Sequence, residues 1–127
     1  DYVLMQPAAE VDHRFVLLPD PRGAPQPGER VRLFSGVGSV VGNPRTFEGT
    51  VQSVSEQAVW VLMDGLFNPG TMSGSPFVSQ HSGKAVGMLV AGTIRGKHLF
   101  LCAHPVGSLV RLSEQAASYP EFSEFIQ

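Results

Sequence analysis

The sequence predicts an all-β protein, an antiparallel β-barrel or sandwich with one helix near its C-terminal end. Short apolar runs recur about every 8–12 residues and are separated by Gly- and Pro-rich turns, a pattern typical of antiparallel sheets. Glycine and proline account for 14 and 10 of the 127 residues. This composition favours many turns between short strands over long helices.

The expected elements follow one another through the chain. Two short apolar runs, Asp1–Met5 and Arg14–Leu18, precede a Pro- and Gly-rich loop that ends at Gly28. Polar and apolar residues then alternate at 30–34, as in a half-buried strand. Further strands are expected at residues 46–54, 58–63, 77–79, 85–91 and 98–103. Residues 106–117 have apolar side chains at helical spacing and predict the helix.

Composition excludes several classes of function. The net charge of −2 gives no electrostatic argument for binding nucleic acid or an anionic membrane surface. No apolar run approaches the roughly 18 residues that a membrane span requires. Cys102 is the single cysteine, so an intrachain disulfide is impossible and cysteine usage does not identify the cellular compartment of the protein. Because His81, Cys102 and His104 lack the spacing of metal ligands, we expect neither a metal site nor a cofactor.

The stretch Gly70–Val78, GTMSGSPFV, is the strongest candidate for chemistry. Small residues and a proline shape a tight turn around Ser73, followed by an apolar run that must enter the core. A serine presented on such a turn can act as a nucleophile, because the turn exposes its hydroxyl and aims nearby N–H groups at one point. The alternative is an ordinary Gly/Ser turn before Pro76.

The segment Thr71–Pro76, TMSGSP, resembles the G-x-S-G-[GS]-P nucleophile turn of chymotrypsin-like (trypsin-fold) serine peptidases. The hairpin at 77–92 resembles the one that lines the substrate cleft of this family, and residues 98–112 are similar to the last strand and helix of its HtrA-like branch. Asp1–Met5 resembles the strand whose aspartate orients the catalytic histidine. The resemblance implies a complete second β-barrel with a C-terminal helix at 41–127, and a remnant of the first barrel with the inter-barrel connection at 1–40.

The resemblance also implies roles for individual residues. Ser73 would be the nucleophile, Asp1 would orient the base, and the N–H groups of Thr71 and Ser73 would form the oxyanion hole. Phe67 would lie near the floor of the specificity pocket and imply an apolar residue before the cut. The wall of that pocket would be formed by Leu89, Val90, Ala91 and Gly92. Residues 89–91 would also bind peptide as an added β-strand.

Two positions depart from the family pattern. The family's catalytic histidine precedes the aspartate, whereas His13, His81, His98 and His104 all follow Asp1 and match no motif. Thr71 replaces the usual oxyanion glycine and would be strained if that position required a positive φ.

Two hypotheses follow from these departures. The chain is a fragment of a serine endopeptidase, inactive alone, that acts on peptide or protein substrates once a missing N-terminal segment of the same protein supplies the histidine. Alternatively, it is a catalytically inactive trypsin-fold scaffold that binds peptides or partner proteins. In the second case Asp1 is simply a solvated carboxylate.

Overall fold

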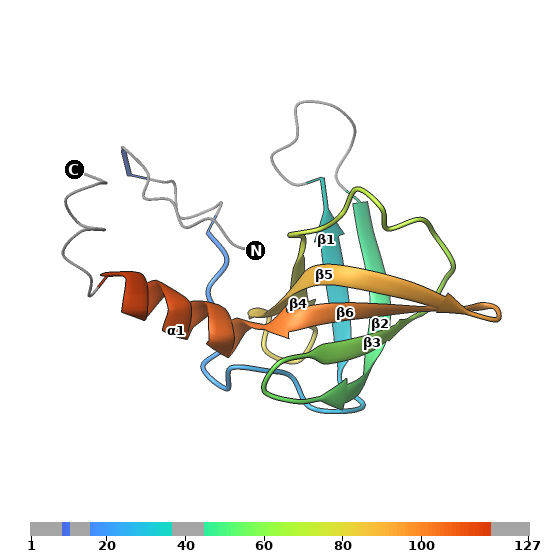
Figure 1. Cartoon of the computed structure of the whole chain (residues 1–127), viewed down its shortest axis with the longest axis horizontal. Coiled ribbons are helices and arrows are strands. Elements are labelled where there is room, and N and C mark those ends of the chain that lie inside the picture. The colour runs from blue at the N-terminus through green and yellow to red at the C-terminus, as the bar shows by residue number, and fades with distance from the viewer. Residues whose placement is uncertain (1–8, 11–15, 37–44, 118–127) are drawn as a thin grey trace.

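Six antiparallel strands close into a barrel, and one helix follows the last strand (Figure 1). The computed structural model of the chain describes residues 9–10, 16–36 and 45–117. The elements are β1 (Arg30–Ser35), β2 (Arg45–Val54), β3 (Val59–Met63), β4 (Pro76–Ser79), β5 (Ala85–Arg95), β6 (His98–Pro105) and α1 (Val106–Ala117). The strand order around the barrel is β1-β2-β3-β6-β5-β4, and β4 closes it by pairing with β1. The predicted all-β class with a C-terminal helix is confirmed.

The barrel interior is filled by the inward-facing residues of all six strands. In β3, Val59, Val61 and Met63 are buried, while Trp60 between them is exposed. In β6, Leu99 and Leu101 are almost completely buried and Phe100 is only half-buried. Because successive side chains of a strand point to opposite faces, this period-two pattern places one face of each strand in the core. The packed interior provides a rigid support for the loops at the barrel ends.

The six strands expected between residues 30 and 103 are all present, and the helix has the predicted bounds. Strand β5 runs further than expected, because it pairs with β6 up to a turn at Gly96, whose φ is +61°. Strand β6 also runs further, because His104 and Pro105 pair with Met88 and Gly87. The strand expected at Asp1–Met5 lies outside the described residues.

The strand expected at Arg14–Leu18 is wrong for residues 16–18, the part that the structure describes. These three apolar residues are exposed. They lead into a single parallel bridge, in which the Ala85 N–H donates to the Leu18 carbonyl at 2.9 Å and the Asp20 N–H donates to the Ala85 carbonyl at 2.8 Å. The Asp20 carbonyl accepts the Gly23 N–H at 3.0 Å and the Arg22 N–H donates to the Asp20 side chain at 2.9 Å, so the backbone turns away and the pairing does not extend into a strand.

Strand β1 lies before the domain boundary expected at residue 40. It pairs with β2 along its whole length and with β4 from Val31 to Leu33, so Arg30–Ser35 is an integral strand of the closed barrel. The described residues before it, 16–29, form turns and irregular backbone. The assignment of residues 1–40 to a remnant of a first barrel and the inter-barrel connection otherwise stays a prediction.

A buried aspartate, Asp20, joins residues 16–29, the N-terminal connector, to the β4–β5 turn. Asp20 is 3% exposed and accepts two hydrogen bonds from the Arg22 guanidinium, at 3.0 and 2.8 Å. The Ser82 hydroxyl donates to the same carboxylate at 2.7 Å, and Arg22 also pairs with Glu29 at 2.7 Å. The Arg22 side chain, together with Ser82, holds the pKa of Asp20 well below its usual range.

Helix α1 begins against the same connector. The Gly107 N–H donates to the Gly23 carbonyl at 2.8 Å, so the connector caps one of the helix's first N–H groups. A Cβ atom on Gly107 would lie 3.0 Å from the Gly23 Cα. The two backbones can therefore approach this closely only because residue 107 is a glycine, whereas Gly23 is required by its φ of +81°. Within the described part of the chain, no helix is long and apolar enough to cross a membrane.

Candidate active site

Two successive turns present Ser73 at the end of the barrel. The Met72 N–H donates to the Pro69 carbonyl at 3.0 Å, and the Ser75 N–H donates to the Met72 carbonyl at 2.9 Å. Gly74 has a φ of +89°, whereas Ser73 does not have a positive φ, which makes the second turn type II with Ser73 at its second position. This geometry leaves Ser73 exposed and requires a glycine directly after it.

The serine turn is hydrogen-bonded to β5. The Gly74 N–H donates to the Leu89 carbonyl at 2.8 Å, and the Leu89 N–H donates to the Ser75 carbonyl at 2.9 Å. A β-bulge follows at once, because Leu89 pairs with Ala103 and Ala91 pairs with Cys102, which leaves Val90 as the extra residue. The position of Ser73 therefore depends on a strand that comes later in the chain.

The N–H groups of the turn fall into two sets. Within the described part of the chain, the N–H groups of Thr71 and Ser73 have no hydrogen-bond partner, and both residues are exposed. The remaining N–H groups between residues 70 and 75 all donate within the protein: those of Gly70, Met72, Gly74 and Ser75. The two donors that the resemblance implies for an oxyanion hole are thus the two whose N–H groups have no partner among the described residues. Thr71 has no positive φ, so it is free of the strain considered for it.

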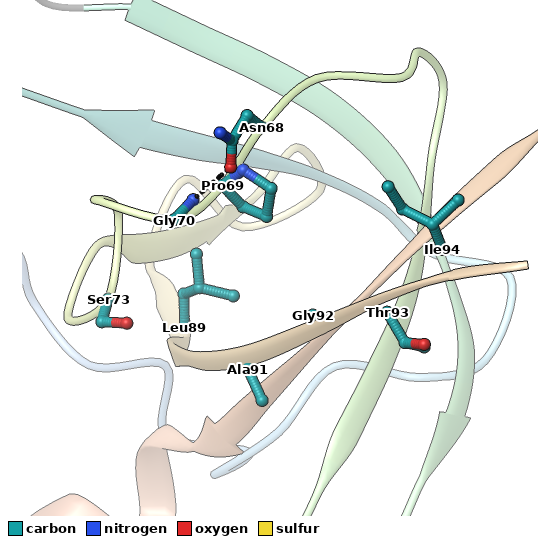
Figure 2. Close-up of a pocket in the computed structure, with 9 residues that line it drawn as sticks. All are labelled: Asn68, Pro69, Gly70, Ser73, Leu89, Ala91, Gly92, Thr93 and Ile94. Carbon is teal, nitrogen blue, oxygen red and sulfur yellow. Dashed lines mark hydrogen bonds between the residues drawn. The ribbon is translucent and has the colours of Figure 1, made fainter.

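Beside the turn lies an open pocket of about 500 Å³. Figure 2 shows the pocket between the loop that precedes the turn and the strand β5, with the Ser73 side chain at one end. Among the described residues, its lining contains no Asp, Glu, Lys, Arg or His. The lining residues are Asn68, Pro69, Gly70, Ser73, Leu89, Ala91, Gly92, Thr93 and Ile94.

One edge of β5 is open along this pocket. Strand β4 pairs with β5 only between Ala85 and Met88, whereas β6 pairs with it as far as Arg95. Among the described strands, only β6 is therefore paired with β5 beyond Leu89. Ala91 and Gly92 are exposed on this part of the strand. An open strand edge next to a pocket can accept an extended peptide through main-chain hydrogen bonds.

The structure brings together most, but not all, of the residues that the sequence singled out. Ser73, Leu89, Ala91 and Gly92 line the pocket, and Val90 is the bulge residue within the same strand. Phe67 lies elsewhere. Its ring stacks on Phe47 of β2, with centroids 3.9 Å apart and an interplanar angle of 19°, and it packs against the barrel core. Asp1 lies outside the described residues.

No described histidine forms a hydrogen bond with the serine. His81 is exposed in the β4–β5 turn, His98 is exposed at the start of β6, and His104 is half-buried in β6 opposite Met88. His13 lies outside the described residues. Within the described part of the chain, the Ser73 hydroxyl makes no hydrogen bond. Nor do the described residues contain a group of three His, Cys, Asp or Glu side chains that could hold a metal ion.

Part of the pocket lining was not among the site residues expected from the sequence. Asn68, Pro69 and Gly70 form its loop side, and the Asn68 side-chain oxygen accepts a hydrogen bond from the Gly70 N–H at 3.0 Å (Figure 2). Asn-Pro-Gly is a strong turn signal and could have indicated this loop. Thr93 and Ile94 were missed because β5 was expected to end at Ala91.

Comparisons with known proteins identify the fold. No protein-family model matches the chain, and no curated protein matches it in sequence. Among solved structures, the chain is similar to kallikrein-related peptidase 10, with a TM-score of 0.61 and 16% sequence identity. The match covers 91% of this chain and 60% of that peptidase. The closed six-stranded barrel and its terminal helix therefore have the chymotrypsin-like fold.

Proposed function

We propose that this chain carries the nucleophile of a serine endopeptidase, which hydrolyses peptide bonds through an acyl-enzyme on Ser73. One observation carries the proposal. An exposed serine and the two unused N–H groups of its turn lie beside a pocket and an open strand edge. Acyl transfer needs this combination: a nucleophile, donors for the developing oxyanion, and a surface that holds the peptide.

The roles of these groups follow from the chemistry. A peptide adds to the open edge of β5 as an extra strand, with its scissile carbonyl at Ser73. The Ser73 Oγ bonds to the carbonyl carbon while its proton passes to a base, and the N–H groups of Thr71 and Ser73 donate to the oxyanion. The base then protonates the leaving amine. Water finally hydrolyses the ester and regenerates the serine.

The proposed mechanism needs a base, and the described residues do not provide it. We infer that it is a histidine supplied by an N-terminal segment of the same protein and oriented by Asp1, as the resemblance to the HtrA-like branch implies. The chain spans 60% of the solved peptidase to which it is similar. On this proposal, the chain alone is inactive.

A second candidate is a trypsin-fold scaffold that binds peptides or partner proteins without cleaving them. It is favoured by the Ser73 hydroxyl, which makes no hydrogen bond within the described part of the chain. A serine without a base is a weak nucleophile. The pocket and the open edge of β5 would serve binding equally well.

Labelling with a fluorophosphonate probe separates the two candidates. We expect the intact protein to be labelled, the Ser73→Ala variant to lose all labelling, and Ser113→Ala to be labelled like the wild type. Ser113 is an exposed serine on α1 and provides the matched control. A folded intact protein that takes up no label would contradict the peptidase and favour the scaffold.

A further inference from the structure

Another pocket lies on the outer face of the barrel, where β2, β3, β5 and β6 run side by side. Its volume is about 270 Å³, below the roughly 300–1,000 Å³ of sites that enclose a small-molecule ligand. It therefore suits a single large side chain of a protein partner. The lining residues are Gln52, Ser53, Trp60, Thr93, Arg95 and Phe100.

Two aromatic rings form the apolar part of this pocket. Trp60 is exposed and Phe100 is half-buried, and the residues on either side of each are buried, so both rings point outward. Trp60 pairs with Cys102, two residues after Phe100 in β6. The two rings are therefore diagonal neighbours on one face of the sheet, close enough for one inserted side chain to contact both. An aromatic or apolar side chain is the natural occupant.

The β5–β6 hairpin gives the same pocket a positive charge. Arg95 lines the pocket, Lys97 follows in the turn of the hairpin, and both are exposed. Residues 85–105, which form the whole hairpin, contain no Asp or Glu, although the chain as a whole carries a net charge of −2. A partner that places carboxylates beside its aromatic side chain would thus be complementary to the pocket in charge as well as in shape.

We propose that this pocket binds residues 119–125 of a second copy of this chain. The sequence of that segment is YPEFSEF, in which Glu121 and Glu124 stand on either side of Phe122. Residues 118–127 contain no Lys or Arg. An aromatic ring of the segment packs on Trp60 and Phe100, and its glutamates pair with Arg95 and Lys97. This inference is independent of the chemistry proposed for Ser73.

The reach of the chain favours a second copy over docking within one chain. Helix α1 and the tip of the β5–β6 hairpin extend from opposite sides of the barrel (Figure 1). From Phe100, β6 continues to Pro105 over about 17 Å, and α1 adds about 18 Å before Ala117. Phe125 follows Ala117 by eight residues, which span at most about 29 Å. The segment is therefore too short to return to its own pocket.

Sedimentation velocity of the full chain tests this docking. A contact between two different surfaces leaves one of each free, so the wild type should form chains that lengthen with concentration and shorten with added salt. Two double variants reverse the charges of the pocket (Arg95→Glu with Lys97→Glu) and of the segment (Glu121→Lys with Glu124→Lys). Each should be monomeric by itself. Their mixture should form a heterodimer, because the first keeps its segment and the second keeps its pocket. A monomeric wild type, or a mixture that does not associate, would overturn the proposal.

Trp60 is the only tryptophan in the sequence, so its fluorescence reports on the pocket directly. A synthetic peptide of residues 118–127, added to the segment variant, should shift the Trp60 emission to shorter wavelengths. Adding Arg95→Gln to that variant should raise the Kd of the peptide about fivefold, the effect of one exposed ion pair. Arg111→Gln, the same change at an exposed position of α1, should leave the Kd unchanged.

Equal Kd values for Arg95→Gln and for the control would overturn the role of Arg95. A wild type that stays monomeric while its Trp60 emission differs from that of the segment variant would show docking within one chain. That outcome would overturn the second copy as the occupant.

Discussion

At the scale of single residues, the backbone of the serine turn depends on Gly74. Its φ of +89° lies in the left-handed region, which an L-amino acid with a Cβ atom adopts only with strain. A Cβ at this position would meet no atom within 4 Å. The constraint is therefore conformational rather than one of space.

We expect Gly74→Ala to lower the free energy of unfolding by about 1 kcal/mol, because alanine is strained at this φ. It should also weaken fluorophosphonate labelling, since the turn that presents Ser73 must change to relieve the strain. Urea unfolding and labelling rates measure the two effects. Gly65→Ala is the matched control: its Cβ would also meet nothing within 4 Å, and its φ is not left-handed. Equal stability of the two variants would contradict the argument.

Several residues of the pocket were named from the sequence. Ser73 is indicated by its Gly/Ser/Pro turn, and the resemblance to the peptidase hairpin pointed to Leu89, Ala91 and Gly92, which line the same pocket. Their roles stay predictions. Phe67 could not be placed, because its position depends on Phe47 of another strand. The role of Asp1 stays a prediction, as does the identity of the base.

At the scale of elements, the contact between α1 and the connector shows how closely two backbones pack. A Cβ on Gly107 would lie 3.0 Å from the Gly23 Cα and 3.2 Å from its carbonyl oxygen. Backbone atoms cannot move aside as a flexible side chain can. The close approach also gives the Gly107 N–H its partner, the Gly23 carbonyl.

We therefore expect Gly107→Ala to destabilise the protein by about 2 kcal/mol, as overpacking does, although alanine normally favours a helix. Ser113→Ala, on the exposed face of the same helix, should be neutral or slightly stabilising. Urea unfolding of both variants measures the difference. If Gly107→Ala were as stable as Ser113→Ala, the helix would not be held by this contact.

Strands could be predicted from the sequence where apolar and polar residues alternate. The prediction failed where an apolar run stays exposed to solvent. Strands β1–β6 could be recognised because their inward residues form the core. Residues 16–18 were misread because an apolar run usually indicates a buried strand, whereas these three side chains are exposed. Barrel closure through β1 and β4 could not be read from local pattern, because it joins strands distant in the chain.

At the scale of the whole molecule, the cluster of Asp20, Arg22, Glu29 and Ser82 holds the connector against the barrel. The pKa of Asp20 is held below its usual value by Arg22, and the pKa of Glu29 is lowered mainly by the same guanidinium. A carboxylate with a lowered pKa in the folded state stabilises that state above its unfolded pKa. This stabilisation is lost as the pH falls from the unfolded pKa toward the folded pKa.

We expect the free energy of unfolding to decrease as the pH is lowered from about 5 to about 2. Asp20→Asn should cost about 2 kcal/mol at neutral pH and much less at the acid end. Asp64→Asn should cost less at neutral pH, because the ion pair of Asp64 with Arg30 is solvent-exposed. Urea titrations at several pH values test this. A constant difference between wild type and Asp20→Asn across the range would refute it.

The hydrogen bonds between the serine turn and Leu89 have a consequence for the order in which the protein can become functional. A growing chain that has reached Ser79 already contains every residue of the turn, but it lacks β5, whose backbone holds that turn. Pairings between distant strands form late, because the chain must first close a long loop. The turn that presents Ser73, the proposed nucleophile, is therefore assembled only when the barrel is complete, so an unfinished or misfolded chain does not present it.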